Sequence, residues 1–411
     1  MKKIIILFCC CALVAACSDD KRYAPKEGRL TVFDVAAVQQ ATGQVDLDQS
    51  VLVSEWTQPM QNLQNKLPHI QATVTEKSIW SRRISKGDKL PNRALPTPVI
   101  VGKDMYVLDG AYTLTKVNVE TGEQIWQQNL AEAKQGLSLA YADQKVFALS
   151  TDGLVMAMDE QGKQLWQKDL ATATRAQLLA DKKAIYLVTA QNQLIVLNAK
   201  SGQEIWRYQT TKPETWLTNM AAPAKSGHII VAPFATGEVI AFDADSGMLL
   251  WIQMMVGDRP KDLMAVPQIV AAPVIEGNTV YLTGNANLIG AYDLKTGQTK
   301  WVLPEGATLT PVVGGNALFL LTNENRLMAV DKKSGKIFWQ KEFKPQDKEM
   351  LWQGLFLLND ALVLRNAEQW VLINPKTGER IKTEKRVSAT QPILVDQHLL
   401  LINDKMKATY F

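Results

Sequence analysis

Reactive and metal-binding side chains are scarce in this sequence. Its 411 residues include four cysteines and three histidines, and three of the cysteines are adjacent, at positions 9 to 11, in an N-terminal apolar run. The histidines are far apart and show no metal-ligand spacing. The chain also lacks a glycine-rich phosphate loop and a nucleophile elbow. These absences argue against a metal centre, a disulfide framework and a recognisable catalytic constellation.

A strong excess of one charge is missing too. The chain has 45 lysines and arginines against 41 aspartates and glutamates, and the basic residues form no stripe with aromatic partners. We therefore expect no nucleic-acid partner.

The chain does contain a repeat. A phrase of an Asp or Asn, usually three residues, a Gly, three residues and usually a Trp occurs seven times, with 38 to 50 residues between successive Trp positions. The last position of the phrase is occupied, in order, by Trp126, Trp166, Trp206, Trp251, Trp301, Trp339 and Lys382. This period is that of a β-propeller blade.

Each copy can be read as four short strands joined by tight turns. In the first copy we expect strands at 98–101, 105–109 and 114–118, then a turn in which Gly122 supplies a positive φ, and a strand carrying Trp126. Such a pattern predicts an all-β blade. We expect the recurrent Trp to wedge between adjacent blades as a structural element. A ligand cage is the alternative.

The ends of the chain suggest how the ring closes. Residues 391–410 read as an eighth set of strands without its outer strand, and Thr73–Trp80 is a strand-like run that ends in a Trp without preceding strands of its own. We expect this N-terminal strand to complete the C-terminal blade, so that no sheet edge is left open at the closure. The predicted fold is an all-β, eight-bladed propeller of four-stranded antiparallel blades. Seven blades, with the last segment packed elsewhere, is the alternative.

The N-terminus has the features of a secretory signal. Lys2 and Lys3 precede an apolar run from Ile4 to Val14, and small residues then precede Cys17. This arrangement resembles the bacterial lipoprotein box, which implies that Cys17 carries lipid. An ordinary signal cleaved near Ala16 is the alternative. We expect a signal peptide at 1–16, a lipidated tether and N-terminal extension at 17–72, and the propeller at 73–411.

Two connections between blades are longer than the others, 210–220 and 254–269. Each joins the outer strand of one blade to the inner strand of the next, and the blades are neighbours, so we expect both loops on one rim. They are unusually apolar, with Trp216, Leu217, Met220, Leu263 and Met264. An apolar cluster of this kind predicts a protein-binding patch. The alternative is that these side chains plug the channel or cap the core.

Together, the lipobox, the charged tether, the N-terminal latch strand and the blades resemble the BamB family, the β-propeller lipoproteins of the outer-membrane protein assembly machinery. Glu55–Pro59 and the phrase at 98–109 resemble its alphaproteobacterial members in particular. The resemblance implies a non-catalytic scaffold without a cofactor, anchored by lipid at the periplasmic face of the outer membrane. It also implies binding to the periplasmic domains of the BamA insertase, a monomer within that complex, and help in delivering nascent outer-membrane proteins.

The residues that carry the family's contact match only in part. The resemblance places a family Leu on Leu217, but a family Arg falls on Thr218, and two acidic positions fall on Gln268 and Val270. A charged contact would be missing here. The interaction would then depend on Leu217 and its apolar neighbours.

The repeat also resembles the blades of pyrroloquinoline-quinone dehydrogenases, so an enzyme is a rival interpretation. That resemblance implies a bound calcium, a catalytic Asp and a disulfide between adjacent cysteines. The mature chain has no cysteine pair, and Asp243, Asp293 and Asp331 recur at the blade turn, where they read as structural residues. We expect no enzymatic activity, no cofactor and no metal. A propeller that binds another periplasmic partner remains a third alternative.

Overall fold

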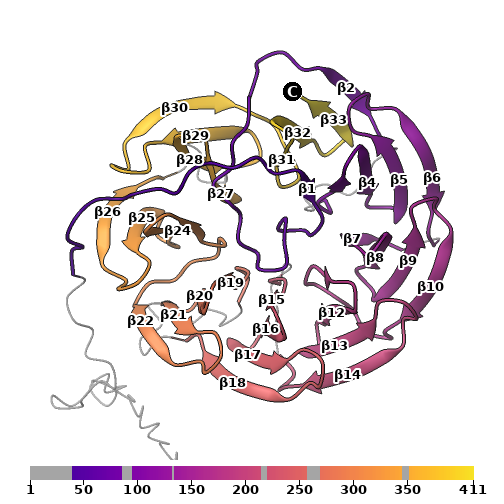
Figure 1. The fold of residues 1–411 in the computed structure, drawn as a ribbon, viewed down its shortest axis with the longest axis horizontal. Helices are drawn as coiled ribbons and strands as arrows, with labels where there is room; N and C mark the ends of the chain where they lie inside the picture. Colours follow the sequence, from indigo (N-terminus) through magenta and orange to yellow (C-terminus); the bar gives the residue numbers. More distant parts are fainter. Residues whose placement is uncertain (1–38, 86–94, 132–133, 214–219, 257–268, 345–350) are drawn as a thin grey trace, which may run out of the picture. The chain divides into compact units, whose positions relative to one another are not determined.

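The computed structural model describes residues 39–85, 95–131, 134–213, 220–256, 269–344 and 351–411, and Ala37–Phe411 form one compact unit. Every regular element in the described ranges is a β-strand. Eight antiparallel sheets stand around a ring, as Figure 1 shows. The predicted eight-bladed propeller is therefore confirmed.

Each of the first four blades is a meander in which the inner strand comes first in the sequence. Their strands are, for blade one, β3 (Val99–Val101), β4 (Asp104–Leu108), β5 (Thr113–Asn118) and β6 (Gln124–Asn129); for blade two, β7 (Gly136–Ala142), β8 (Lys145–Ser150), β9 (Leu154–Asp159) and β10 (Gln164–Asp169); for blade three, β11 (Leu179–Ala180), β12 (Ala184–Val188), β13 (Gln193–Asn198) and β14 (Glu204–Gln209); for blade four, β15 (Ala224–Ser226), β16 (Ile229–Pro233), β17 (Glu238–Asp243) and β18 (Leu249–Met254).

Blades five to seven repeat this plan, and blade eight takes its outer strand from the N-terminal region. The strands are, for blade five, β19 (Val274–Glu276), β20 (Thr279–Gly284), β21 (Leu288–Asp293) and β22 (Thr299–Leu303); for blade six, β23 (Val312–Gly314), β24 (Ala317–Leu321), β25 (Arg326–Asp331) and β26 (Ile337–Glu342); for blade seven, β27 (Gly354–Leu358), β28 (Ala361–Arg365), β29 (Gln369–Ile373) and β30 (Arg380–Lys385); for blade eight, β31 (Ile393–Val395), β32 (His398–Ile402), β33 (Lys407–Tyr410) and β2 (Trp80–Arg83).

The two middle strands of a blade are buried on both faces because a neighbouring blade covers each face. β9, for example, is buried at five consecutive positions, and its sequence is a continuous apolar run rather than an alternating one. The outer strands are largely exposed. The core is accordingly divided into apolar clusters between adjacent blades.

The closure of the ring follows the prediction, with one correction to its bounds. β2 pairs antiparallel with β33, with Trp80 opposite Tyr410. The strand therefore begins at Trp80, whereas the sequence predicted a strand that ends there. The residues before it reach blade eight through separate hydrogen bonds, from Thr73 N to the Gln397 carbonyl (2.8 Å) and from Ile79 N to the Tyr410 carbonyl (2.8 Å). The chain comes into register with β33 only at the end of the predicted run.

The repeated Trp and the repeated Gly form one contact between adjacent blades. In seven of the eight junctions, an indole Nε1 donates to a backbone carbonyl in the outer turn of the next blade, at 2.8 to 3.1 Å. The Gly of that turn has a positive φ and lies so close that an added Cβ would be 2.5 to 3.2 Å from the indole. The pairs are Trp80 with Gly122, Trp126 with Gly162, Trp166 with Gly202, Trp206 with Gly247, Trp251 with Gly297, Trp301 with Gly335 and Trp339 with Gly378. The structural interpretation of the Trp is confirmed.

The lost Trp at Lys382 has a topological reason. Lys382 lies on the outer strand of blade seven. A Trp at this position would have to place its indole against the outer turn of blade eight. In blade eight, however, the outer strand is β2 and its neighbour is β33, which are remote in sequence. No hairpin joins them, and so no turn Gly is present to receive an indole.

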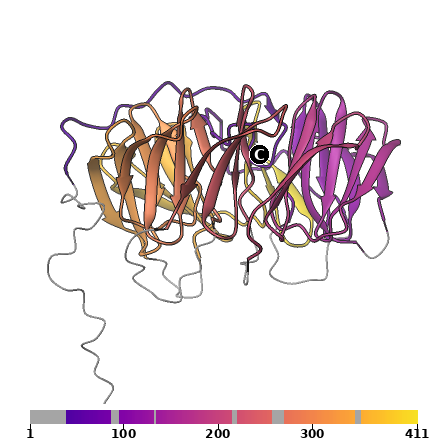
Figure 2. The same cartoon turned by 90° about the horizontal axis from the view of Figure 1, so that it is seen from below.

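The described part of the N-terminal extension, residues 39–72, crosses one face of the ring and contacts all eight blades (Figures 1 and 2). In blade one, β1 (Glu55–Trp56) adds to the inner edge of β3 as a fifth strand. The contacts with the other blades are hydrogen bonds from Tyr141 N to the Thr57 carbonyl (2.8 Å), from Ala180 N to Gln58 Oε1 (3.1 Å), from Lys225 N to the Leu63 carbonyl (2.7 Å), from Ile275 N to the Gln64 carbonyl (3.0 Å), from Ala41 N to the Ile337 carbonyl (2.9 Å), from Asn359 N to the Ile70 carbonyl (2.8 Å) and from Asp396 N to the Val53 carbonyl (2.8 Å).

Candidate functional site

Most residues of the predicted partner-binding patch lie outside the described residues. Trp216, Leu217 and Thr218 belong to the interval 214–219, and Leu263, Met264 and Gln268 belong to the interval 257–268. Cys17 lies outside as well, in the first 38 residues. The structure therefore places only Met220 from this set.

Met220 is buried, with 5 % of its surface exposed. It belongs to the apolar cluster between blades three and four, pairs with Ala176 in a parallel β-bridge and donates its backbone N–H to the Arg175 carbonyl (3.2 Å). Met220 thus caps the core between blades three and four. This agrees with the alternative interpretation, in which the apolar side chains of the loops cap the core, and Met220 itself presents no surface to a partner.

The described ends of the two long loops lie on the same rim of the ring. The first loop leaves blade three where Thr210 N donates to the carbonyl of Asn192, and the second leaves blade four where Met255 N donates to the carbonyl of Gly237. Both acceptors lie in turns between the two middle strands of a blade. The N-terminal extension instead contacts most blades near the turn that joins their first and second strands, and it also contacts Ile337 at the start of the outer strand of blade six; these contacts lie on the opposite rim. The N-terminal extension therefore covers one rim, and the two long loops leave from the other.

The second loop is rooted in the core. Met255 is fully buried between blades four and five, where the hydroxyl of Tyr292 lies 3.5 Å from its sulfur, and Ile269 is buried at the far end of the loop. Burial raises the pKa of Tyr292 to about 12, so this hydroxyl stays protonated at neutral pH. Both ends of the loop are thus fixed by packing.

Two of the three histidines, His69 and His398, use their rings to bind backbone carbonyls. The ring of His69 is buried and lies between the backbone carbonyls of Asp48 (2.8 Å from Nδ1) and Asn359. The Nδ1 of His398 lies 2.9 Å from the Phe411 carbonyl. Among the described residues no group of three or more His, Cys, Asp or Glu side chains is arranged to hold a metal ion.

The recurrent Asp residues organise the outer turns, as their spacing predicted. Asp243 Oδ1 accepts hydrogen bonds from the hydroxyl (2.7 Å) and the backbone N–H (2.8 Å) of Ser246, and both lower the pKa of Asp243 below its ordinary value. Asp293 and Asp331 accept the equivalent bonds in blades five and six. The repeat thus uses these carboxylates to hold the turn that receives an indole.

Two buried amide side chains of the extension bind backbone groups of the blades beneath it. The buried amide of Gln58 pairs with the backbone of Ala180, with Nε2 to O at 2.9 Å and N to Oε1 at 3.1 Å. The buried amide of Asn65 donates to the carbonyls of Pro223 (3.0 Å) and Pro273 (3.2 Å). These residues were not recognised from the sequence. Gln58 belongs to the segment Glu55–Pro59, whose family resemblance does not indicate this contact.

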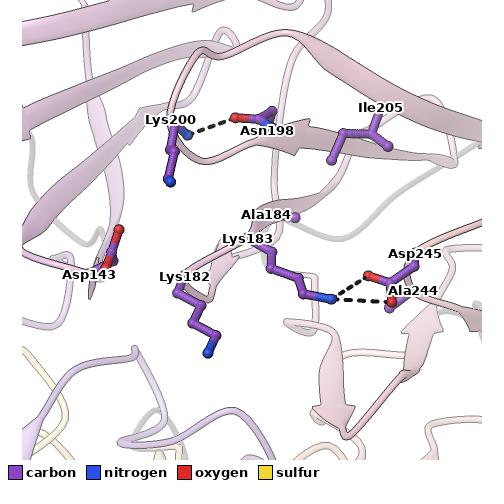
Figure 3. Close-up of a pocket in the computed structure, with 9 residues that line it drawn as sticks. All are labelled: Asp143, Lys182, Lys183, Ala184, Asn198, Lys200, Ile205, Ala244 and Asp245. Atoms are coloured by element: carbon purple, nitrogen blue, oxygen red, sulfur yellow. Dashed lines mark hydrogen bonds and ion pairs between the residues drawn. The ribbon is translucent and has the colours of Figure 1, made fainter.

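A shallow groove with a volume of about 510 Å³ crosses the rim of blade three (Figure 3). Its charged groups are mostly paired: Lys183 Nζ lies 3.2 Å from Asp245 Oδ1, and Asp143 is bound by Lys145, which lowers its pKa. Lys182 and Lys200 also line it. The lining residues form no pair of a nucleophile and a base, so the groove offers charge but no catalytic arrangement.

Both a family model and a curated relative match this sequence over most of the propeller. The model of a family described as outer membrane protein assembly factor BamB matches residues 28–140 and 110–341. A curated relative, outer membrane protein assembly factor BamB of Alteromonas naphthalenivorans, is 27 % identical over 273 residues. That match spans 61 % of this chain and 64 % of the relative.

Solved structures show the same fold at low identity. The crystal structure of BamB from Moraxella catarrhalis superposes with a TM-score of 0.68 at 17 % identity, covering 81 % of this chain and 98 % of that one. A europium-containing methanol dehydrogenase superposes with a TM-score of 0.67 at 12 % identity, covering 85 % of this chain and 90 % of that one. Because the fold is common to both classes, it does not by itself select a function. The family model, which matches well over half of the sequence, does discriminate between them: this chain belongs to the BamB family of outer membrane protein assembly factors.

Proposed function

We propose that this protein is a lipid-anchored scaffold in the assembly of outer-membrane β-barrel proteins. Lipid on Cys17 would hold it at the periplasmic face of the outer membrane, and the loops before blades four and five would bind the periplasmic domains of a BamA-like insertase. The observation that carries the proposal is the match to the BamB family over 28–341.

The two faces of the ring support this assignment of roles. The extension covers one rim with contacts to every blade, so that rim is largely occupied by the chain itself. The roots of the two long loops are anchored on the other rim, in neighbouring blades. Rigid roots suit a binding loop, since less conformational freedom is lost when the partner binds.

A non-catalytic role is supported by how the polar groups are used. The turn carboxylates hold their own turns, the rings of His69 and His398 bind backbone carbonyls, and Gln58 and Asn65 bind backbone groups in, or just before, inner strands of the blades. Each of these groups is already engaged in a structural bond.

The experiment is co-purification from the native envelope. Leu217→Asp combined with Met264→Asp should strongly reduce recovery of the insertase, because a charge at an apolar contact must be desolvated without a partner. The melting temperature of the propeller should stay nearly unchanged. Undiminished recovery would remove the assignment of these loops.

A matched control places the same charges on the outer strands of blades that do not carry the two loops. Ile125 and Ile381 are 52 % and 56 % exposed on outer strands of blades one and seven. Ile125→Asp combined with Ile381→Asp should leave recovery of the insertase unchanged.

A quinone-dependent dehydrogenase, the rival activity, is tested by adding pyrroloquinoline quinone and calcium and measuring dye reduction with alcohols or sugars. We expect no reduction above the level without protein.

A further inference from the structure

The outer strand of blade four carries a row of exposed apolar side chains. Leu249, Ile252 and Met254 are 40 %, 46 % and 50 % exposed, and Met248, just before the strand, is 61 % exposed. The three strand residues lie opposite Phe242, Ile240 and Glu238 of β17, which are alternate positions of that strand. They therefore lie on the same face of the sheet.

A β-bulge aligns this row. Trp251 pairs with Ala241 and Leu249 pairs with Phe242, so Leu250 is the extra residue on the outer strand. Without the bulge, Leu249 would share the face of Trp251. With it, Leu249 joins Ile252 and Met254, and Trp251 is free to contact blade five. The row, which we call the β18 row, consists of Leu249, Ile252 and Met254.

The β18 row differs from the same positions in every other blade. Those positions are two residues before, one after and three after the Trp of the repeat, and each of the other seven sets contains polar residues or proline. The sets are Gln124, Gln127 and Asn129; Gln164, Gln167 and Asp169; Glu204, Arg207 and Gln209; Thr299, Val302 and Pro304; Ile337, Gln340 and Glu342; Arg380, Thr383 and Lys385; and Ser78, Ser81 and Arg83. Exposed outer strands are normally protected from association by charged side chains. Blade four alone has three fully apolar residues there.

The backbone of β18 is available beside this row. In the strand order β15-β16-β17-β18, β18 is the last strand, and within the described ranges no further strand pairs with its outer side. The protein already shows strand addition at another edge, where β1 extends blade one to five strands. An extended segment that binds the β18 edge would gain backbone hydrogen bonds and apolar contacts on one face.

We propose that β18 is a docking edge for an unfolded strand of an outer-membrane β-barrel protein, which adds to blade four as a fifth strand. This inference rests on the proposed assembly function and names the part of the substrate that is recognised. Transmembrane β-strands alternate apolar and polar side chains over about ten residues. Their apolar face matches the spacing of the β18 row. A strand with charges on that face would have to desolvate them against Leu, Ile and Met.

The test measures peptide binding by fluorescence anisotropy. The probe is a peptide of about ten residues with apolar side chains at alternate positions, the length of a transmembrane strand. The control peptide has the same composition with its apolar residues contiguous. The protein variant is Leu249→Glu, Ile252→Arg and Met254→Gln, which installs the residues that blade three carries at the same positions, with Glu204 and Arg207 already forming an ion pair there.

The wild-type protein should bind the alternating peptide at least about tenfold more tightly than the control, and the triple variant should lose about tenfold in affinity, since three apolar contacts are removed. Recovery of the insertase is compared with the double variant Leu249→Glu and Ile252→Arg, which leaves Met254 at the start of the second long loop intact, and this recovery should be unchanged. A variant built from blade one, Leu249→Gln, Ile252→Gln and Met254→Asn, should behave alike if the first does not fold.

Three results would overturn the proposal: equal affinity of variant and wild type, equal affinity for the two peptides, or a wild-type dimer that the triple variant dissociates, which would show that a second copy covers the row. These results leave the insertase proposal intact, because that is judged by the loop variant alone. Conversely, the loop variant Leu217→Asp with Met264→Asp could still co-purify the insertase while the triple variant binds the peptide more weakly. That combination would refute only the proposal that the loops bind the insertase.

Discussion

The indole Nε1 of Trp80 donates to the carbonyl oxygen of Val119 at 2.9 Å, and this bond joins the strand that completes blade eight to the outer turn of blade one. Gly122 in the same turn lies against the indole, where an added Cβ would be 2.7 Å from the ring. The same contact that links blades along the ring is thus also used where the ends of the propeller meet. The stability of the ring should depend on each such pair.

Gly122→Ala should destabilise the protein more than Gly102→Ala. Both glycines have positive φ, so each substitution costs about 1–2 kcal/mol from backbone conformation. Only the Cβ at 122 also collides with an indole, whereas nothing lies within 4 Å of the Cβ at 102. Overpacking of this kind adds about 1–3 kcal/mol. Urea denaturation measures the difference, and equal midpoints would contradict the role of this contact.

The position of Lys382 should not benefit from a restored Trp. Lys382→Trp is expected to change the free energy of unfolding by less than about 0.5 kcal/mol, because no hairpin joins the two outer strands of blade eight and no turn there can receive the indole. The reverse change, Trp339→Lys, should cost about 3–5 kcal/mol, since it removes a buried indole and its bond to the Pro375 carbonyl (2.8 Å). Thermal unfolding of both variants separates the two positions. A clear gain from Lys382→Trp would refute the topological explanation.

Glu276 should make the attachment of the extension sensitive to acid. Burial alone would raise its pKa, but ion pairs with Lys332 (2.7 Å) and Lys66 (2.7 Å) outweigh burial and lower it. A carboxyl whose folded-state pKa is lowered contributes stability above its unfolded pKa and loses it as pH falls through the folded value. The protection factors of residues 62–70 against hydrogen exchange, which correct for the pH dependence of the intrinsic rate, should therefore fall as pH drops below about 4.5.

The control for this prediction is Glu276→Gln. The amide cannot titrate, so the variant should exchange faster than wild type at neutral pH and should lose this part of the acid dependence. If wild type and variant show the same dependence on pH, Glu276 is not the group responsible. Lys103 and Glu120, an exposed pair at 2.9 Å, offer a comparison site, since surface pairs contribute little.

Gln58 should be required to hold the extension over the axis. Gln58→Leu preserves much of the volume but leaves the N–H and the carbonyl of Ala180 without the partners that the amide supplies, which costs about 1–3 kcal/mol for each buried group left unpaired. Limited proteolysis within residues 57–66 should become faster. Gln61→Leu, at a half-buried neighbour, should have a smaller effect; equal cleavage of the two variants would argue against a special role for Gln58.

The sequence was sufficient to predict the ring because the repeat is local and periodic. One phrase contains the Asp or Asn that holds the outer turn, the turn Gly and the indole. The Gly and the indole of neighbouring copies contact each other across every junction but one. The closing strand was found as well, although its bounds were wrong, because its register depends on β33, which lies more than 300 residues away. Pairings at that separation leave little trace in the local pattern.

The extension and the β18 row were harder to predict for different reasons. Gln58 and Asn65 bind backbone groups of distant blades, and any polar residue in a loop would look similar in the sequence. The β18 row depends on a bulge that brings Leu249 onto the face of Ile252. Aligning the seven copies at the Trp would have revealed it, since blade four alone lacks polar residues at all three positions.

The path of the extension decides where a mechanical load enters the molecule. The chain meets blade six first, through the Ala41 bond to Ile337, and only later reaches β2, whose four residues close the circle. Tension arriving from the residues before Gln39 is therefore resisted by a blade that is complete in itself. The closing strand is shielded from pull for as long as those upstream bonds hold.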